Sequence, residues 1–109
     1  MGSTLDIATL QRRIDEFISQ FEAGYWSPLA NLGRLIEEVG ELAREINHHH
    51  GPKTKKDAED EGSIAEELGD IVFTVATIAN SLGIDLAEAV EANLNKVVER
   101  DSSRWKKKT

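Results

Sequence analysis

LIEEVGELAREI at residues 35–46 and IAEELGDIVFTVATIA at residues 64–79 are the two stretches that decide the fold. In each, apolar residues recur every three or four positions, which is the period of an amphipathic helix. After Asp70 the second stretch is apolar on nearly every side, so it predicts the central and most buried helix. No segment alternates with the period of a strand.

Helix-start and helix-stop signals flank both stretches. Ser27, followed by proline, is typical of an N-cap and predicts a helix over about residues 28–48. Ser63, with a glutamate three residues later, forms a capping-box pattern and predicts a helix over about residues 64–82. Gly83 is placed to end that second helix.

Two further helices lie outside this pair. An apolar stripe with intervals of three and four residues predicts an N-terminal helix that Gly24 ends; its members are Ile7, Leu10, Ile14, Phe17 and Phe21. Asp85 opens a fourth helix in the same way as Ser63. We therefore expect an all-α, four-helix bundle in one domain over residues 1–109, with a loop at about 51–62 and a polar, basic tail at about 102–109. A chain this short buries only a modest core, so homo-oligomerisation is expected to complete it.

Composition excludes several classes of protein. The net charge is −7, from 20 acidic and 13 basic residues, so a basic footprint for a nucleic-acid polymer is absent. The chain has no cysteine, which excludes disulfides and thiolate metal sites and fits a reducing compartment. The longest strongly apolar stretch, residues 71–84, is too short to span a bilayer, and no signal peptide is recognisable. We expect a cytoplasmic protein without a membrane partner.

Paired carboxylates are the feature most suggestive of chemistry. Glu38 and Glu41 are three residues apart on the first central helix, as are Glu67 and Asp70 on the second, so each pair shares a helical face. If the two helices pack antiparallel, the pairs face each other. Converging like charges repel unless they are protonated or neutralised. A hard divalent cation such as Mg²⁺ takes oxygen ligands and also accepts phosphate oxygens, so the pattern predicts a magnesium site.

A solvated acidic surface is the alternative for any one such pair, since glutamate is enriched in helices. Neighbouring glutamates could simply form ion pairs with Arg34 or Arg44. Each pair, however, has an interior glycine, Gly40 or Gly69, and each glycine costs about 1 kcal/mol relative to alanine. We take these glycines to predict that another group approaches the backbone closely.

Polar and basic residues on the fourth helix complement the acids. Asn93, Lys96 and Arg100 are spaced three and four residues apart on one face, where they can bind phosphate oxygens. The lysines of the loop form a second candidate phosphate-facing group: Lys53, Lys55 and Lys56. An ordinary polar helix surface and a solubilising loop are the simpler interpretations of these two groups.

With these motifs the sequence resembles the MazG-like, all-α nucleoside triphosphate pyrophosphohydrolases. Their pattern is Glu-x-x-Glu, a spacer, then Glu-x-x-Asp, matched here at residues 38–41 and 67–70. ANLNKVVERD at residues 92–101 resembles a third signature of the family, in which an asparagine and a lysine contact phosphates. The resemblance covers about residues 5–101 and is greatest to small single-domain members.

The resemblance implies hydrolysis of a nucleoside triphosphate at the α–β bond, giving the monophosphate and pyrophosphate, and it implies a role in nucleotide-pool housecleaning. It implies Mg²⁺, or Mn²⁺ in its place, and a homodimer or homotetramer. Carried over, the metal ligands are Glu38, Glu41, Glu67 and Asp70. The phosphate-binding residues are Asn93, Lys96 and Arg100, and the water-activating base is Glu38, or else Glu37.

Other functions stay open at this point. The chain could be a non-catalytic helical module that binds a nucleotide or a partner protein, or a phosphoribosyl-ATP pyrophosphohydrolase with the same metal pattern. Glu45 and His48 form one Glu-x-x-His pair, but a di-iron bundle needs two. Tyr25, Trp26 and Trp105 are candidates to stack on the nucleobase. Tyr25 and Trp26 could instead pack locally ahead of the second helix, which is what we expect for Tyr25, while Trp26 stays open.

Overall fold

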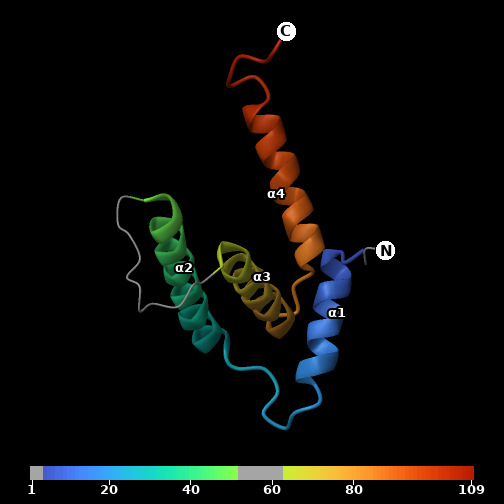
Figure 1. The fold of residues 1–109 in the computed structure, drawn as a ribbon. Helices are drawn as coiled ribbons and strands as arrows, with labels where there is room; N and C mark the ends of the chain where they lie inside the picture. Colours follow the sequence, from blue (N-terminus) through green and yellow to red (C-terminus); the bar gives the residue numbers. More distant parts are fainter. Residues whose placement is uncertain (1–3, 52–62) are drawn as a thin grey trace.

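The computed structural model describes residues 4–51 and 63–109 as four helices (Figure 1). These are α1 (Ile7–Ile18), α2 (Pro28–His50), α3 (Ile64–Ser81) and α4 (Leu86–Asp101). The described ranges contain no strand, so the predicted all-α class is confirmed. Almost all of the predicted loop, with Lys53, Lys55 and Lys56, lies outside the described residues.

The predicted N-caps of the last three helices are confirmed. The side chains of Ser27, Ser63 and Asp85 accept hydrogen bonds from backbone N–H groups three residues ahead, at 3.1, 3.2 and 3.1 Å. Each bond satisfies a donor that the first helical turn leaves without a partner. Gly83 follows α3 with φ +68°, a left-handed conformation that glycine adopts without a steric penalty.

The predicted end of the N-terminal helix is wrong, because α1 stops at Ile18 rather than near Gly24. The backbone N–H groups of Gln20 and Phe21 bond carbonyl oxygens three residues back, at 3.3 and 3.1 Å, so the chain tightens into turns. Phe21 meets Phe17 edge to face with ring centroids 5.3 Å apart, and both rings stay exposed. The apolar stripe thus continues past the helix without being buried.

Helix α3 is central, since it packs against α2 on one side and against α1 on the other (Figure 1). Its buried residues are Thr74, Ala76, Thr77 and Ala79. The prediction of a central helix is therefore confirmed, but the large apolar residues Leu68 and Val72 of α3 stay about half exposed, at 49% and 51%. Small and hydroxylated side chains form the contact surface instead.

A polar network joins α1, α3 and the start of α4. Gln11 Nε2 donates to Asn80 Oδ1 at 2.8 Å, and Gln11 Oε1 accepts from the backbone N–H of Leu86 at 3.0 Å. Asn80 Nδ2 also donates to the Tyr25 hydroxyl, which in turn donates to Asp15 at 2.7 Å. Tyr25 therefore holds the α1–α2 connection through hydrogen bonds rather than through apolar packing.

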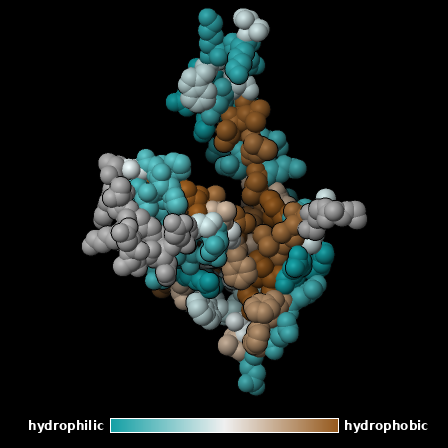
Figure 2. All heavy atoms as spheres, in the orientation of Figure 1, coloured by the Kyte–Doolittle hydropathy of each residue, from teal (hydrophilic) through white to brown (hydrophobic). Residues whose placement is uncertain are grey.

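Helix α4 contacts α1 and leads away from α2 and α3 (Figure 1). Figure 2 shows apolar side chains gathered in a band that continues along much of α4. On α4 the exposed apolar residues recur every four positions: Val90, Leu94 and Val98. The Cα radius of gyration is 17.7 Å, whereas a compact chain of this length has about 13 Å.

Among the described helices, none is by itself long and apolar enough to cross a membrane; α3 and α4 reach that length and hydropathy only as a pair, with a bend of 113° between them.

Candidate metal and substrate site

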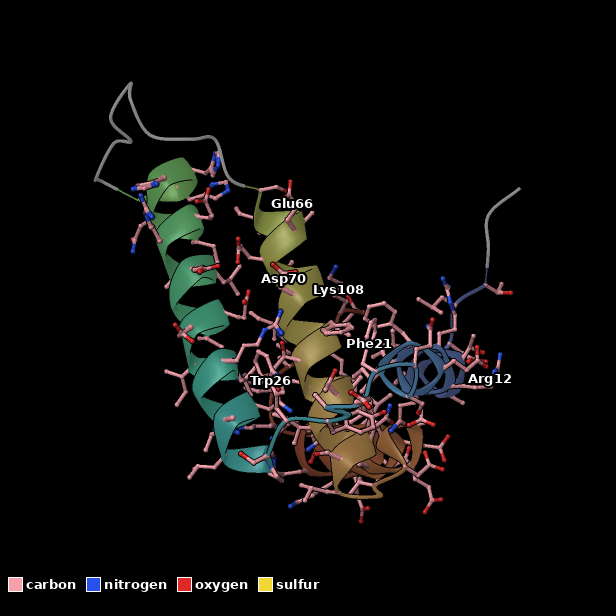
Figure 3. The ribbon with its side chains drawn as sticks, turned by 90° about the horizontal axis from the view of Figure 1, so that it is seen from below. Arg12, Phe21, Trp26, Glu66, Asp70 and Lys108 are labelled. Atoms are coloured by element: carbon pink, nitrogen blue, oxygen red, sulfur yellow. The ribbon has the colours of Figure 1, made fainter. Side chains whose placement is uncertain are left out.

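The predicted carboxylates meet on the contact between α2 and α3. Single carboxylate oxygens of Glu38, Glu67 and Asp70 all lie within 4.8 Å of one another. The carboxyl group of Glu41 approaches that of Glu67 closely enough to form a hydrogen bond when one of them is protonated. Figure 3 shows Asp70 on the side of α3 that faces α2. The structure thus brings together all the residues that were predicted as metal ligands.

The electrostatics of this cluster favour neutralisation. Loss of hydration raises the pKa of Glu38, the charges of Glu41 and Asp70 raise it further, and Arg34 partly offsets them. Loss of hydration also raises the pKa of Glu67, together with the contact and charge of Glu41. Oε2 of Glu38 and Oε2 of Glu67 are buried, and neither has a hydrogen-bond partner in the described part of the chain.

This donor set fits a hard divalent cation. Such a cation prefers carboxylate oxygens as ligands. Oε2 of Glu38 and Oε2 of Glu67 can serve as two of them, because neither has a hydrogen-bond partner in the described ranges. Protons would neutralise the cluster too, but glutamates titrate near pH 4.5 before these shifts. At neutral pH a cation therefore stabilises the cluster better than protonation does.

Two neighbouring acids lie outside the cluster. Glu37 and Glu66 are exposed, and neither supplies an atom to the group of close carboxylate oxygens among the described residues. Glu66 lies in the first turn of α3, where its charge suits the helix dipole. The helical period of about 100° per residue explains why adjacent glutamates separate onto different faces.

The interior glycines do not mark a close approach inside the chain. A Cβ atom added at Gly40 or at Gly69 would meet nothing within 4 Å. The close approach predicted from these glycines is therefore absent from the described residues.

The predicted phosphate-binding stripe does not reach the carboxylates of the same chain. Asn93, Lys96 and Arg100 are exposed on α4, which packs against α1. The turn at Gly83 and the hydrogen bond from the Leu86 N–H to α1 direct the helix away. The Arg100 guanidinium instead pairs with its neighbour Asp101, with Nη2 3.0 Å from Oδ2.

The predicted alternative with Glu45 and His48 gains no support from the geometry. Glu45 is buried, and its Oε1 lies 3.6 Å from Nε2 of His49. The potential ligand atoms that gather in the described part of the chain come from Glu38, Glu67 and Asp70. A second Glu-x-x-His pair for a di-iron site is absent from the sequence.

A pocket that the sequence analysis missed lies between the end of α1, the α1–α2 connection, α2 and α3. It encloses about 200 Å³, and its lining includes Phe17, Tyr25, Trp26, Asn31, Arg34, Phe73 and Thr77. Asn31 is only 3% exposed, and its Nδ2 has no hydrogen-bond partner among the described residues. The signal in the sequence is an asparagine on the face of α2 that, three and seven residues later, carries Arg34 and Glu38.

Arg34 connects the pocket to the carboxylates. Its guanidinium carbon lies 5.8 Å from the ring centroid of Trp26 and 6.0 Å from that of Phe73. Its Nε lies 3.9 Å from Oε1 of Glu38, whose side chain is 14% exposed. Figure 3 shows Trp26 and Asp70 along the same contact between α2 and α3. Pocket and carboxylate cluster are therefore two halves of one continuous region.

Comparisons with known proteins identify relatives of the whole chain. The family model described as the MazG nucleotide pyrophosphohydrolase domain matches residues 26–105. Protein YpjD of Bacillus subtilis (strain 168) is 50% identical over 99 residues, which cover 91% of this chain and 89% of that protein. Protein YvdC of the same organism is 26% identical over 102 residues, covering 88% and 96%.

Two solved crystal structures are also similar to this chain. The crystal structure of YPJD from Bacillus subtilis matches with a TM-score of 0.77 and 47% identity, over 87% of this chain and 97% of that one. The crystal structure of the Bacillus-conserved MazG protein, a nucleotide pyrophosphohydrolase, matches with a TM-score of 0.75 and 44% identity, over 87% and 92%.

Proposed function

Since the chain belongs to the MazG nucleotide pyrophosphohydrolase family, we propose that it cleaves the α–β bond of a nucleoside triphosphate, with Mg²⁺, to give the monophosphate and pyrophosphate. The observation that carries this proposal is the convergence of carboxylates from α2 and α3, with two buried oxygens that have no partner in the described ranges. Nucleotide-pool housecleaning stays a prediction of the resemblance.

The residues that would hold the cation are Glu38, Glu41, Glu67 and Asp70. A bound Mg²⁺, or Mn²⁺ in its place, neutralises phosphate charge and helps to orient the triphosphate. The protein's own contribution is positional, because α2 and α3 fix the carboxylates on facing helical surfaces.

Hydrolysis needs a base in addition to a neutralised phosphate. The oxygen of a water molecule forms a bond to phosphorus, the bridging P–O bond of the α–β linkage breaks, and the bridging oxygen leaves with one of the two products. The proton of the water passes to a carboxylate, a role that we assign to Glu38 because one of its carboxylate oxygens belongs to the group gathered between α2 and α3. Glu37, the second candidate base, is exposed and lies outside the carboxylate group.

The predicted phosphate-binding stripe on α4 would serve a second copy of the chain. Its apolar face, with Val90, Leu94 and Val98, is exposed in one copy, as is the apolar face of α2 with Leu29 and Ile36. Faces of this kind mark surfaces that another protein covers. We propose a homodimer or homotetramer in which Asn93, Lys96 and Arg100 of one copy bind the phosphates held at the carboxylates of another.

The direct test is a turnover screen over a panel of nucleoside triphosphates, with Mg²⁺ and with a chelator, and with every product identified. The proposal predicts monophosphate and pyrophosphate in the Mg²⁺ reactions alone. Diphosphate with orthophosphate would contradict the bond assignment. Binding without any turnover would favour a non-catalytic module, and turnover of phosphoribosyl-ATP alone would favour a phosphoribosyl-ATP pyrophosphohydrolase.

A further inference from the structure

We propose that the aromatic pocket beside the carboxylates binds the nucleobase, and that Asn31 and Thr77 select bases with a carbonyl next to a ring N–H. This edge occurs in uracil, thymine, guanine and hypoxanthine, whereas cytosine and adenine carry an amino group next to an unprotonated ring nitrogen. The inference rests on the proposed function, and it adds the class of base to it.

The shape of the pocket suits a single ring system. Its volume of about 200 Å³ lies below the roughly 300 to 1,000 Å³ of pockets that enclose a whole drug-sized ligand. Trp26, Tyr25 and Phe73 line it, and aromatic faces stack on any base. The ribose and the phosphates would then remain outside, toward the rest of the α2–α3 contact.

The position of the pocket fits the length of a nucleotide. Asn31 and Glu38 are seven residues apart on α2, which is about 10 Å along a helix axis. That separation suits a base at Asn31 and a phosphate near Glu38. Arg34, between the two residues, lines the pocket and pairs with Glu38, so it lies where the sugar and first phosphate would pass.

The polar groups in the pocket define the edge of the base. Asn31 offers Nδ2–H, a buried donor with no partner in the described part of the chain. The hydroxyl proton of Thr77 is engaged, because Oγ1 donates to the carbonyl oxygen of Phe73 at 2.8 Å. Thr77 therefore presents only lone pairs to the pocket. One donor and one acceptor complement a base carbonyl and its adjacent ring N–H.

A structural role explains Asn31 poorly. A buried amide donor without a partner destabilises a folded protein, and an apolar side chain of similar size would fill the same space. A protein is expected to keep such a destabilising donor where the donor binds a ligand. Replacing Asn31 should therefore affect binding more than folding.

Two matched pairs of substrates test the proposal, since UTP differs from CTP, and ITP from ATP, at the edge in question. For the wild-type protein we expect kcat/KM to be higher for UTP and ITP, by about tenfold or more in at least one pair. The pair that shows the difference tells whether the pocket takes pyrimidines or purines. Asn31→Asp, which replaces the donor by an acceptor, should reduce or reverse the preference in kcat/KM for the carbonyl base over the amino base. Asn31→Leu should remove that preference.

The control is Asn47, which is exposed further along the same helix. Asn47→Asp and Asn47→Leu should leave both ratios unchanged. Melting temperature separates the two roles of Asn31, because Asn31→Leu should melt no lower than the wild type. A lower melting temperature for Asn31→Leu together with unchanged ratios would overturn the proposal in favour of a structural role.

A second measurement needs neither metal nor turnover. In a Trp105→Phe background, Trp26 is the remaining tryptophan, and stacking of UMP, CMP, IMP or AMP should quench its fluorescence. We expect the preferred carbonyl base to bind several-fold more tightly than its amino counterpart. If the protein hydrolyses nucleotides but distinguishes carbonyl from amino bases in neither assay, the proposed role of the pocket is wrong and the proposed function still holds. Discriminating quenching without hydrolysis would support the pocket and contradict the proposed function.

Discussion

Nε of Arg34 lies 3.9 Å from Oε1 of Glu38, and the same guanidinium lies over the ring of Trp26. This relationship joins the two parts of the site, because Arg34 lines the aromatic pocket while its charge acts on a carboxylate of the cluster. The side chain of Arg34 is partly exposed, at 41%, so it can contact a substrate as well as Glu38.

Arg34→Ala should shift the pH dependence of hydrolysis. The positive charge of Arg34 lowers the pKa of Glu38, so its loss raises that pKa further. A base must be deprotonated to accept a proton, and the acidic limb of kcat/KM should therefore move to higher pH. Arg12→Ala is the matched control, since Arg12 forms an exposed pair with Glu16 on α1. Identical acidic limbs in the two variants would contradict the role of Arg34.

The metal-free protein should become less stable as pH rises from about 4.5 toward neutrality. Glu38 and Glu67 have raised pKa values in the folded state, so the folded state binds more protons than the unfolded one in that range. This contribution is present below the ordinary value of 4.5 and is lost as pH rises through the folded pKa values. Asp6 and Asp101 have lowered pKa values in the folded state, so they stabilise it above pH 3.8. That stabilisation is lost only as the pH falls below 3.8, outside the range in which Glu38 and Glu67 act.

Thermal unfolding checks this expectation. The melting temperature of the metal-free protein should fall over that range, and Glu38→Gln should reduce the fall. Mg²⁺ should raise the melting temperature most at the upper end, where the carboxylates are ionised. The electrostatic account would be contradicted if the melting temperature of the metal-free protein rose over the same pH range and Glu38→Gln did not change that dependence.

Leu94→Asp should lower the apparent mass in solution. Leu94 is 58% exposed in one copy, so a charge there costs the single chain little but would be buried in an interface along α4. Light scattering after size-exclusion chromatography measures the mass. Asn95→Asp places the same charge on the neighbouring position and should leave the mass unchanged. Equal masses for both variants would place the contact between copies elsewhere.

Mixing two inactive variants tests whether copies share the site. Asp70→Asn removes a carboxylate of the cluster, and Lys96→Ala removes a predicted phosphate ligand from α4. If each site combines the two from different copies, unfolding and refolding the variants together should restore about one quarter of wild-type activity, because random mixing leaves that share of sites intact. No recovery in verified mixed oligomers would place Lys96 and the carboxylates of each site on the same copy, or exclude Lys96 from the site.

The local parts of this structure could be predicted because they depend on short-range patterns. The capping box that starts at Ser63 spans only four residues, so the sequence alone indicates the N-cap. Glu38 and Glu41 are three residues apart, which places them on the same face of a helix. The end of α1 could not be predicted in this way. Its apolar stripe continues to Phe21, whereas the backbone hydrogen bonds tighten into turns after Ile18.

Relationships between distant segments were the part that sequence patterns missed. The direction of α4 depends on the Gln11–Leu86 hydrogen bond and on the turn at Gly83, which no periodicity reveals. The pocket depends on residues from four segments. No sequence pattern indicates that Asn31 is buried, or that its Nδ2 has no partner among the described residues.

The central claim is that the carboxylates on α2 and α3 form the hydrolytic site. The most direct test measures Mg²⁺-dependent pyrophosphate release by Glu38→Gln and Asp70→Asn, beside Glu66→Gln, which removes an exposed carboxylate from the same helix as Asp70. We predict that the first two lose about a hundredfold or more of kcat/KM while keeping their helical content, and that Glu66→Gln stays close to the wild type. Full activity in Glu38→Gln and Asp70→Asn, or an equal loss in all of the variants, would contradict it.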